Sequence, residues 1–109
     1  MAEPNDAAEQ LAGLFTAMGH PVRVAVLLHL DGHGPCDVSC LSADLGVEQS
    51  ALSHQLARLR KQGLVSATQD GRRRVYALTD AHVTAIVRQA AEHLGCPVGG
   101  SPGGESHPA

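Results

Sequence analysis

Apolar residues recur at helical spacing near the start of the chain. Across residues 7–18 they repeat every three or four positions, which predicts a first helix. The repeating residues are Leu11, Leu14, Phe15 and Met18. A Gly-His-Pro break follows, and the next segment, PVRVAVLLHL at 21–30, is almost entirely apolar. Because proline suits the first turn of a helix, this segment predicts a second helix that is buried on most sides.

Two further helices are predicted in the middle of the chain. The segment DGHGP at 31–35 indicates a turn. Asp37 then suits the N-cap of a short third helix that stops at Gly46. Residues 48–62 form a fourth helix that ends at Gly63. Its apolar face carries Leu52, Leu56 and Leu59.

The pattern changes from helical to alternating after Gly63. Residues 64–78 predict two strands around an Asp70-Gly71 hairpin turn. Thr79 or Asp80 then caps a fifth helix that runs to about Leu94. We therefore expect a mainly α fold with a β-hairpin wing (α+β), a winged helix-turn-helix in the order ααααββα. Its domain spans 7–96, between a flexible N-terminus (1–6) and a disordered Gly/Pro tail (97–109).

Charge is distributed unevenly along the chain. The net charge is −3, yet six of the eight basic residues lie between positions 58 and 74, where Asp70 is the only acid. The chain has two aromatic residues among 109, so its core is small and a dimer is favoured. With an acidic N-terminus and no long apolar run, we expect no membrane span and no secretory signal. Three cysteines without such a signal favour reduced thiols and a cytoplasmic location.

The basic cluster coincides with the two elements that a winged helix places on DNA. The fourth helix begins with short polar side chains that suit base edges in a major groove: Gln49, Ser50, Ser53, His54 and Gln55. Basic residues at its end and at the hairpin suit phosphates: Arg58, Arg60, Lys61, Arg72, Arg73 and Arg74. We expect binding to double-stranded DNA, with an inverted repeat as the operator. The alternatives are charges that only solubilise the surface and a winged helix that binds protein.

Two segments resemble the ArsR/SmtB family of bacterial metal-sensing repressors. They are LFTAMGHPVRVAVLLHL at 14–30 and LSADLGVEQSALSHQLARLRKQGLVSATQDGRRRVYALT at 41–79. The resemblance, which extends over roughly residues 8–96, implies a homodimer whose terminal helices pair across the two-fold axis. It also implies that metal usually weakens operator binding. His20 departs from the family, which usually has Asp there, so the resemblance does not carry the usual capping role to this residue.

Four metal-ligand residue types lie on the predicted fifth helix. His82 and His93 are eleven positions apart and so share a face, but they are separated by roughly 16 Å along the axis. One straight helix cannot bring them to one ion, whereas two antiparallel copies can, with Asp80 and His82 of one chain facing His93 and Cys96 of the other. This donor set suits Zn²⁺ first and Co²⁺ next, with Ni²⁺ open. In the family the pattern is Asp-x-His, ten residues, then His-x-x-Glu or His-x-x-His. Cys96 stands at its last position.

Other ligand types are less clearly arranged. Cys36 and Cys40 form a candidate second thiol site for a soft metal, arsenite or redox chemistry, although their spacing does not match the family's Cys-Val-Cys arrangement. His20, His29 and His33 could form an accessory site, but nothing in the sequence fixes their mutual distances. No nucleophile elbow, phosphate loop or carboxylate pair is present, so we expect no enzyme. The hypothesis is a metal-responsive repressor. Its rivals are a winged-helix regulator that senses thiol redox or arsenite through its cysteines or that has no working metal site, a metal-buffering protein and a protein-interaction module.

Overall fold

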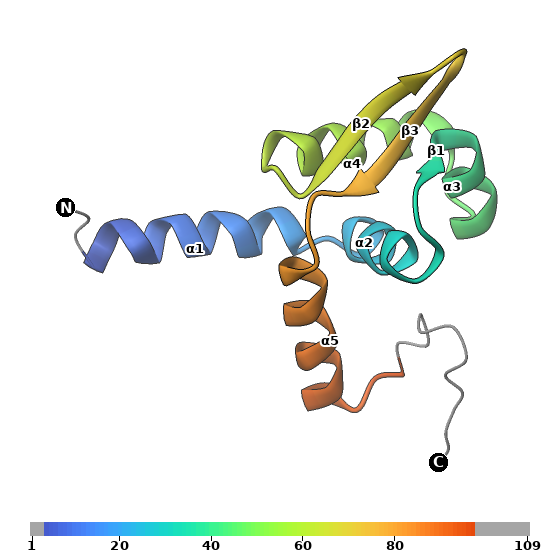
Figure 1. Cartoon of the computed structure of the whole chain (residues 1–109). Helices are drawn as coiled ribbons and strands as arrows, with labels where there is room; N and C mark the ends of the chain where they lie inside the picture. The colour runs from blue at the N-terminus through green and yellow to red at the C-terminus, as the bar shows by residue number, and fades with distance from the viewer. Residues whose placement is uncertain (1–3, 98–109) are drawn as a thin grey trace.

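Five helices and three strands make up residues 4–97, the part of the chain that this computed structural model describes (Figure 1). In chain order they are α1 (Pro4–Met18), α2 (Pro21–His33), β1 (Cys36–Asp37), α3 (Val38–Leu45), α4 (Gln49–Lys61), β2 (Val65–Asp70), β3 (Arg73–Leu78) and α5 (His82–Leu94). The α3–α4 pair and the β2–β3 hairpin lie on one side of α2, while α1 and α5 extend away from it (Figure 1). The predicted winged helix-turn-helix is confirmed.

The sheet has three strands in the order β1–β3–β2, all antiparallel. At the tip of the β2–β3 hairpin, Asp70 pairs with Arg73 across a two-residue turn, where Gly71 has a φ of 64° that glycine adopts at no steric cost. On the other side of β3, Cys36 pairs with Tyr76. The hairpin predicted around Asp70-Gly71 is therefore confirmed, and β1 adds a strand that was not predicted.

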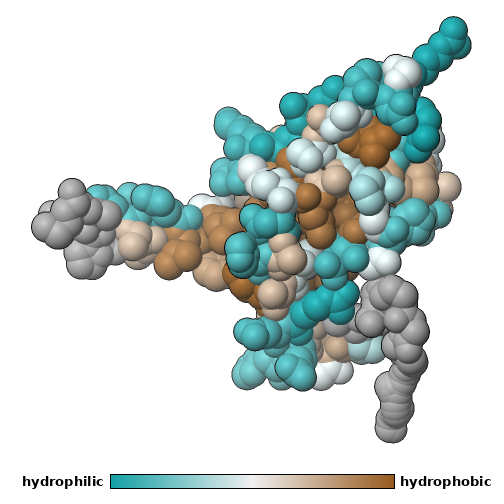
Figure 2. Space-filling view, viewed as in Figure 1, coloured by the Kyte–Doolittle hydropathy of each residue, from teal (hydrophilic) through white to brown (hydrophobic). Residues whose placement is uncertain are grey.

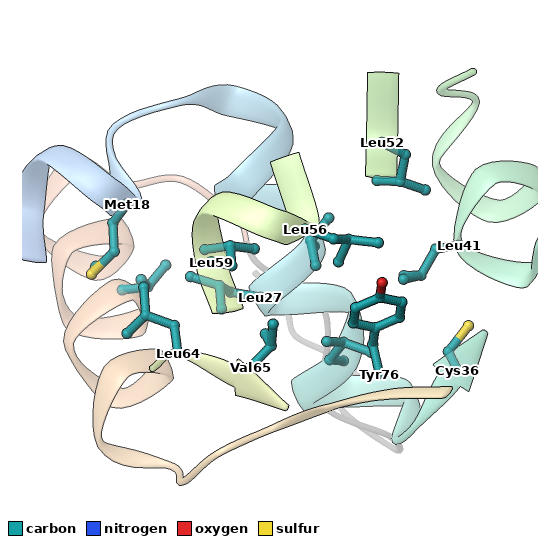
Figure 3. Close-up of a cluster of buried hydrophobic side chains, with 13 residues drawn as sticks. Met18, Leu27, Cys36, Leu41, Leu52, Leu56, Leu59, Leu64, Val65 and Tyr76 are labelled. Carbon is teal, nitrogen blue, oxygen red and sulfur yellow. The ribbon is translucent and has the colours of Figure 1, made fainter. Parts of the chain in front are cut away.

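Leucine side chains from α2, α3 and α4 form the centre of the core (Figure 3). Those with no exposed surface are Leu27, Leu41, Leu52, Leu56 and Leu59. Tyr76 of β3 and Val65 of β2 cover the cluster from the sheet side. The buried face of α4 is thus the leucine face that its sequence predicts, which leaves the opposite face of the helix exposed.

Several predicted boundaries were wrong by a few residues. α1 begins at Pro4 rather than at residue 7, because proline suits a first helical turn and Asp6 lies where the helix dipole favours an acid. α2 continues through Asp31 to His33, where a turn was expected, because Asp31 gains hydrogen-bond partners on α5 and the helix stops only at Gly34. β1 is two residues long, too short for an alternating pattern to predict it. The expected disordered tail, Pro97 excepted, lies outside the described residues.

His20 caps α2 after all. Its Nδ1 atom accepts a hydrogen bond from the Val22 backbone N–H at 3.2 Å, and its backbone is extended, as an N-cap requires. An imidazole nitrogen therefore performs the capping role that the family resemblance assigns to an aspartate. Pro21 at the first helical position completes this start of the helix.

Among the described residues, no single helix is long and apolar enough to cross a bilayer. The bent pair α1 and α2, which meet at 86°, has the length and composition only when the two helices are taken together.

We predict that Leu56→Ala lowers the free energy of unfolding by about 2–5 kcal/mol, because it leaves a cavity in the leucine cluster. Ser53→Ala, on the exposed face of the same helix, should change it by less than about 0.5 kcal/mol. Urea unfolding at one fixed protein concentration measures both. Equal effects of the two substitutions would contradict the packing described for α4.

Candidate nucleic-acid interface and metal-ligand residues

The helix-turn-helix is held at both ends of its first helix. Asp37 caps α3, with Oδ1 accepting a hydrogen bond from the Cys40 backbone N–H at 2.8 Å. At the other end, Gly46 has a φ of 68° and donates its N–H to Ser42. The chain then turns directly into α4. Since leucines occupy the buried face of α4, four of the predicted base-reading side chains lie exposed, namely Gln49, Ser50, Ser53 and His54.

Gln55 differs from these four residues. It is half-buried, and its Oε1 atom accepts a hydrogen bond from the Arg23 guanidinium of α2 at 2.8 Å. Arg23 is itself almost fully buried, and its guanidinium also donates to the Thr16 carbonyl at 3.5 Å, so the two bonds supply partners for a buried charge. Gln55 was expected to suit base edges like the other four residues, but it has a partner within the protein. Its side chain joins α4 to α2.

The predicted phosphate-binding residues are all exposed. Of the three in the hairpin, two have hydrogen-bond partners within the protein and one has none among the described residues. Arg73 donates from Nε to Asp37 Oδ2 at 2.7 Å, and Arg74 donates from Nε to the Tyr76 hydroxyl at 3.1 Å. Arg72, in the turn itself, has no side-chain partner among the described residues. The hairpin tip is one of the most hydrophilic parts of the visible surface (Figure 2). Arg72, Arg58, Arg60 and Lys61 thus remain available for an external anion.

The Arg73–Asp37 pair connects the wing to the start of the helix-turn-helix. The Cys40 backbone N–H and then the Arg73 guanidinium hold the pKa of Asp37 below its usual range. Asp37 in turn raises the pKa of Arg73. A carboxyl whose folded pKa is lowered stabilises the fold above its unfolded pKa and loses that contribution as the pH falls through the folded pKa.

At the start of α5, Asp80 and His82 are already in contact. Asp80 Oδ1 accepts a hydrogen bond from the His82 backbone N–H at 2.9 Å and lies 3.2 Å from His82 Nδ1. The helix itself begins at His82, with Ala81 as the N-cap residue, so the prediction that Thr79 or Asp80 caps it was wrong by one position. Because the carboxylate occupies Nδ1, the ring nitrogen left for a ligand is Nε2. The His82 side chain is 92% exposed.

His93 and Cys96 lie at the opposite end of α5 and are also exposed. Gly95 ends the helix with a φ of 74°, and the Cys96 backbone N–H donates to Ala91 at 2.9 Å, which fixes Cys96 just beyond the last turn. A single protomer therefore does not join the two pairs, which stand about 16 Å apart along the axis. The donors fit a tetrahedral N, S and O site only if a second chain supplies the other half.

Apolar side chains are exposed on the two helices that extend from the body. They are Leu11 and Phe15 of α1 and Ile86 and Leu94 of α5, each between 39% and 73% exposed. These apolar side chains are exposed in the single chain. Between the two helices lies a hollow of about 360 Å³, lined among others by Phe15, Leu28, Ala90 and Cys96.

The structure also brings together residues whose mutual positions the sequence left open. Asp31 accepts hydrogen bonds from Arg88 Nε at 2.8 Å and from Thr84 Oγ1 at 3.3 Å, which fastens α2 to α5. His29 and His33 lie beside Cys36, whereas His20 lies at the other end of α2 and takes no part. The available signal for the histidine pair was its spacing of four residues, which places both rings on one helix face once α2 is known to reach His33.

This architecture and its exposed helix face define a helix-turn-helix transcription regulator, and comparison with known proteins identifies its family. Residues 20–67 match the family described as bacterial regulatory protein, arsR family. The transcriptional regulator NmtR of Mycobacterium tuberculosis is 42% identical over 89 residues, which are 82% of this chain and 73% of NmtR. A transcriptional repressor SmtB homolog of Synechocystis is 40% identical over 82% of this chain and 67% of that protein. The chain belongs to the arsR family, and its relatives are regulators rather than enzymes.

Solved structures agree with this assignment. Apo-NmtR in solution is similar with a TM-score of 0.72 at 37% identity, and the match covers 100% of this chain and 89% of that one. NolR from Sinorhizobium fredii is similar with a TM-score of 0.73 at 33% identity, over 89% of this chain and 98% of that one.

We predict that Asp37→Asn lowers the free energy of unfolding at neutral pH, and that the difference from the unsubstituted protein shrinks as the pH falls below about 3.8, the ordinary pKa of the group. Arg73→Gln should remove part of the same pH dependence, because one of two stabilising partners is lost. Urea unfolding between pH 2 and pH 7 measures both. A difference for Asp37→Asn that does not change with pH would contradict an ionised cap.

Proposed function

We propose that this chain is a homodimeric, metal-responsive repressor that binds an inverted-repeat operator and whose operator affinity is set by a cation held between the α5 helices of the two subunits. The observation that carries the proposal is the surface of α5. Ligand side chains stand exposed at both of its ends, Asp80 with His82 and His93 with Cys96, and exposed apolar residues lie along the same helix. Such a face is completed by a second copy of itself.

Dimerisation would cover the exposed apolar residues of α1 and α5. Phe15 is half exposed and Leu94 is 73% exposed, although both line the hollow between these helices. Two antiparallel α5 helices related by a two-fold axis bring each N-terminal ligand pair to the other chain's C-terminal pair. The dimer therefore has two equivalent sites.

The exposed face of α4 suits a major groove. Its N-terminal residues Gln49, Ser50, Ser53 and His54 would reach base edges, while Arg58, Arg60, Lys61 and the wing residue Arg72 would neutralise phosphates. Arg73 and Arg74 would contribute less, since both have partners within the protein. The two-fold axis presents two α4 helices to half-sites about 34 Å apart.

The cation would act on DNA affinity through the position of α5. With the family's usual direction, its binding favours an arrangement of the two subunits that spaces the α4 helices less well for the operator. A coupling free energy of about 1–3 kcal/mol changes operator affinity roughly 5- to 150-fold, and DNA must weaken metal binding by the same factor. Zn²⁺ suits the donors best, followed by Co²⁺, while Ni²⁺ also accepts imidazole ligands. A cytoplasmic location is proposed with this function, because the thiols must stay reduced.

Two rival functions would give different results. A metal-buffering protein would bind the cation without any change in DNA affinity. A protein-interaction module would show no salt-dependent binding to any duplex.

We predict that Arg72→Ala weakens binding to specific and unrelated duplexes alike and lowers the slope of log K against log salt by about 1 per subunit. Gln49→Ala should instead reduce the difference in binding free energy between the specific duplex and unrelated duplexes, by about 1–3 kcal/mol for each lost base contact. The operator is a duplex selected by the purified protein from a random-sequence library, and fluorescence anisotropy gives the affinities. Ser66→Ala, exposed on β2, is the control. Sequence-specific loss in Arg72→Ala would contradict its assignment to phosphate.

We predict that His93→Ala and Cys96→Ser each weaken Co²⁺ binding to the α5 site at least tenfold and abolish the effect of Co²⁺ on operator affinity. His54→Ala, which removes an exposed histidine on α4, should leave Co²⁺ binding unchanged. Titration of the full-length protein with Co²⁺, followed by its visible absorption with and without operator, measures both effects. An unaltered Co²⁺ response in His93→Ala and in Cys96→Ser would overturn the proposed site.

A further inference from the structure

A second group of metal-ligand side chains lies inside one protomer, between the end of α2 and α3. The ligand atoms of His29, His33 and Cys36 all lie within 4.8 Å of one another, and so do those of His33, Cys40 and Asp44. His33 belongs to both triads. The group shares no residue with the proposed dimer site: His29 contacts Asp44 of α3, whereas Asp31 of the same helix contacts α5.

Regular secondary structure holds each of these residues in place. His29 and His33 are four positions apart on α2, and their rings stack with centroids 4.8 Å apart and planes inclined by 21°. Histidines at this spacing on one helix face are a recurrent zinc-binding arrangement. Cys36 is fixed by the pairing of β1 with Tyr76 on β3, and Cys40 lies in the first turn of α3, which Asp37 caps. Asp44 follows Cys40 by one helical turn.

One buried nitrogen of the group has no hydrogen-bond partner among the described residues. His29 Nε2 is shielded from solvent and lies 3.0 Å from Asp44 Oδ2, but the contact lacks hydrogen-bond geometry, so this nitrogen has no hydrogen-bond partner. The Cys40 thiol donates a hydrogen bond to Asp44 Oδ2 at 3.5 Å, so the same oxygen lies beside a nitrogen and a sulfur of the group. A buried nitrogen without a partner costs free energy, which a bound cation would offset.

The electrostatics also favour a cation. Burial, the hydrogen bond with Cys40 and the negative charges of Cys40, Asp44 and Asp37 raise the pKa of the Cys36 thiol to about 12. A divalent cation reverses the effect of these neighbours, because it stabilises each thiolate directly.

We propose that this group binds a divalent d-block cation with Zn²⁺-like preferences, within a single protomer, with His33 as the shared ligand and with three further donors drawn from His29, Cys36, Cys40 and Asp44. Each thiol that becomes a ligand releases one proton to solvent on binding. Mixed nitrogen and sulfur donors at these separations suit tetrahedral Zn²⁺ or Co²⁺ rather than Mg²⁺ or Ca²⁺. The site joins α2 to the first helix of the helix-turn-helix and requires no partner chain.

The test uses the full-length protein without its α5 ligands, the variant His82→Ala/His93→Ala/Cys96→Ser, kept in a reductant that does not bind metal. We expect this variant to bind one Co²⁺ per protomer with a thiolate-to-cobalt absorption band that Zn²⁺ abolishes by displacement. In the same background, His33→Gln and Cys40→Ser should each weaken Co²⁺ binding at least tenfold, roughly the effect of losing one ligand contact. Both positions lie near the surface, so the fold should survive, as circular dichroism would verify.

His54→Ala in this background is the matched control and should bind Co²⁺ unchanged. The proposal is overturned if the α5-deleted variant binds no Co²⁺, if His33→Gln and Cys40→Ser bind it as the background does, or if the sulfur band persists in Cys36→Ser/Cys40→Ser. Recovery of Cys36 and Cys40 as a disulfide after exposure to air, with no cobalt bound before oxidation, would also overturn it. None of these outcomes depends on dimerisation or operator binding, so they are separate from the test of the α5 site.

Discussion

The position of α5 relative to α2 depends on the hydrogen bonds that the Asp31 carboxylate accepts. This carboxylate accepts hydrogen bonds from Arg88 and Thr84 of α5 while belonging to the last turns of α2, the helix that also packs on α4 and β3. Thr84 is almost completely buried, whereas the side chains of Asp31 and Arg88 are 23% and 31% exposed, so this junction lies at the edge of the core. Hydrogen bonds to a charged group are stronger than neutral ones, and breaking one partner leaves a partly buried charge unsatisfied. A displacement of α5 would therefore be transmitted to α2.

Charges in the wing serve the fold as well as the candidate interface. Arg73 reaches back to Asp37, the residue that caps α3, and Arg74 contacts Tyr76 in the core-facing strand. The Arg73–Asp37 bond adds to the core packing that holds the hairpin against the helix-turn-helix. The basic character of segment 58–74 therefore overstates the charge that is free to meet DNA. The basic residues without partners among the described residues can bind phosphate without first breaking a contact within the protein. They are Arg58, Arg60, Lys61 and Arg72.

Features repeated along the chain could be predicted, whereas those that depend on one distant contact could not. The leucine spacing predicted α4 and its buried face, and Asp70-Gly71 predicted the hairpin, because each pattern is local and periodic. The last turn of α2 was missed because Asp31 and Gly32 favour a turn by local preference, and only the contact with α5 keeps them helical. Gln55 was grouped with the base-reading side chains because helical periodicity places it near the boundary between the buried and exposed faces of α4. Its partner Arg23 lies 32 residues earlier in the chain, so local sequence could not reveal their hydrogen bond. The ligand types on α5 could be found from spacing, but the cluster around His33 required the packing of α2 against α3.

The two proposed metal sites would act on the same helix from opposite sides. Residues two positions apart on an α-helix point about 200° apart, so Asp31 faces α5 while His29 and His33 face α3. A cation bound at His33 would fix the orientation of α3 relative to α2, and one bound between the α5 helices would reach α2 through Asp31. If cations at both sites change the same conformational equilibrium of α2, a cation at one site must change the affinity of the other site for its cation, because coupling free energies are reciprocal. Sites that act on independent motions would instead show additive effects on operator affinity, so the sign and size of the coupling would report whether α2 moves as one rigid element.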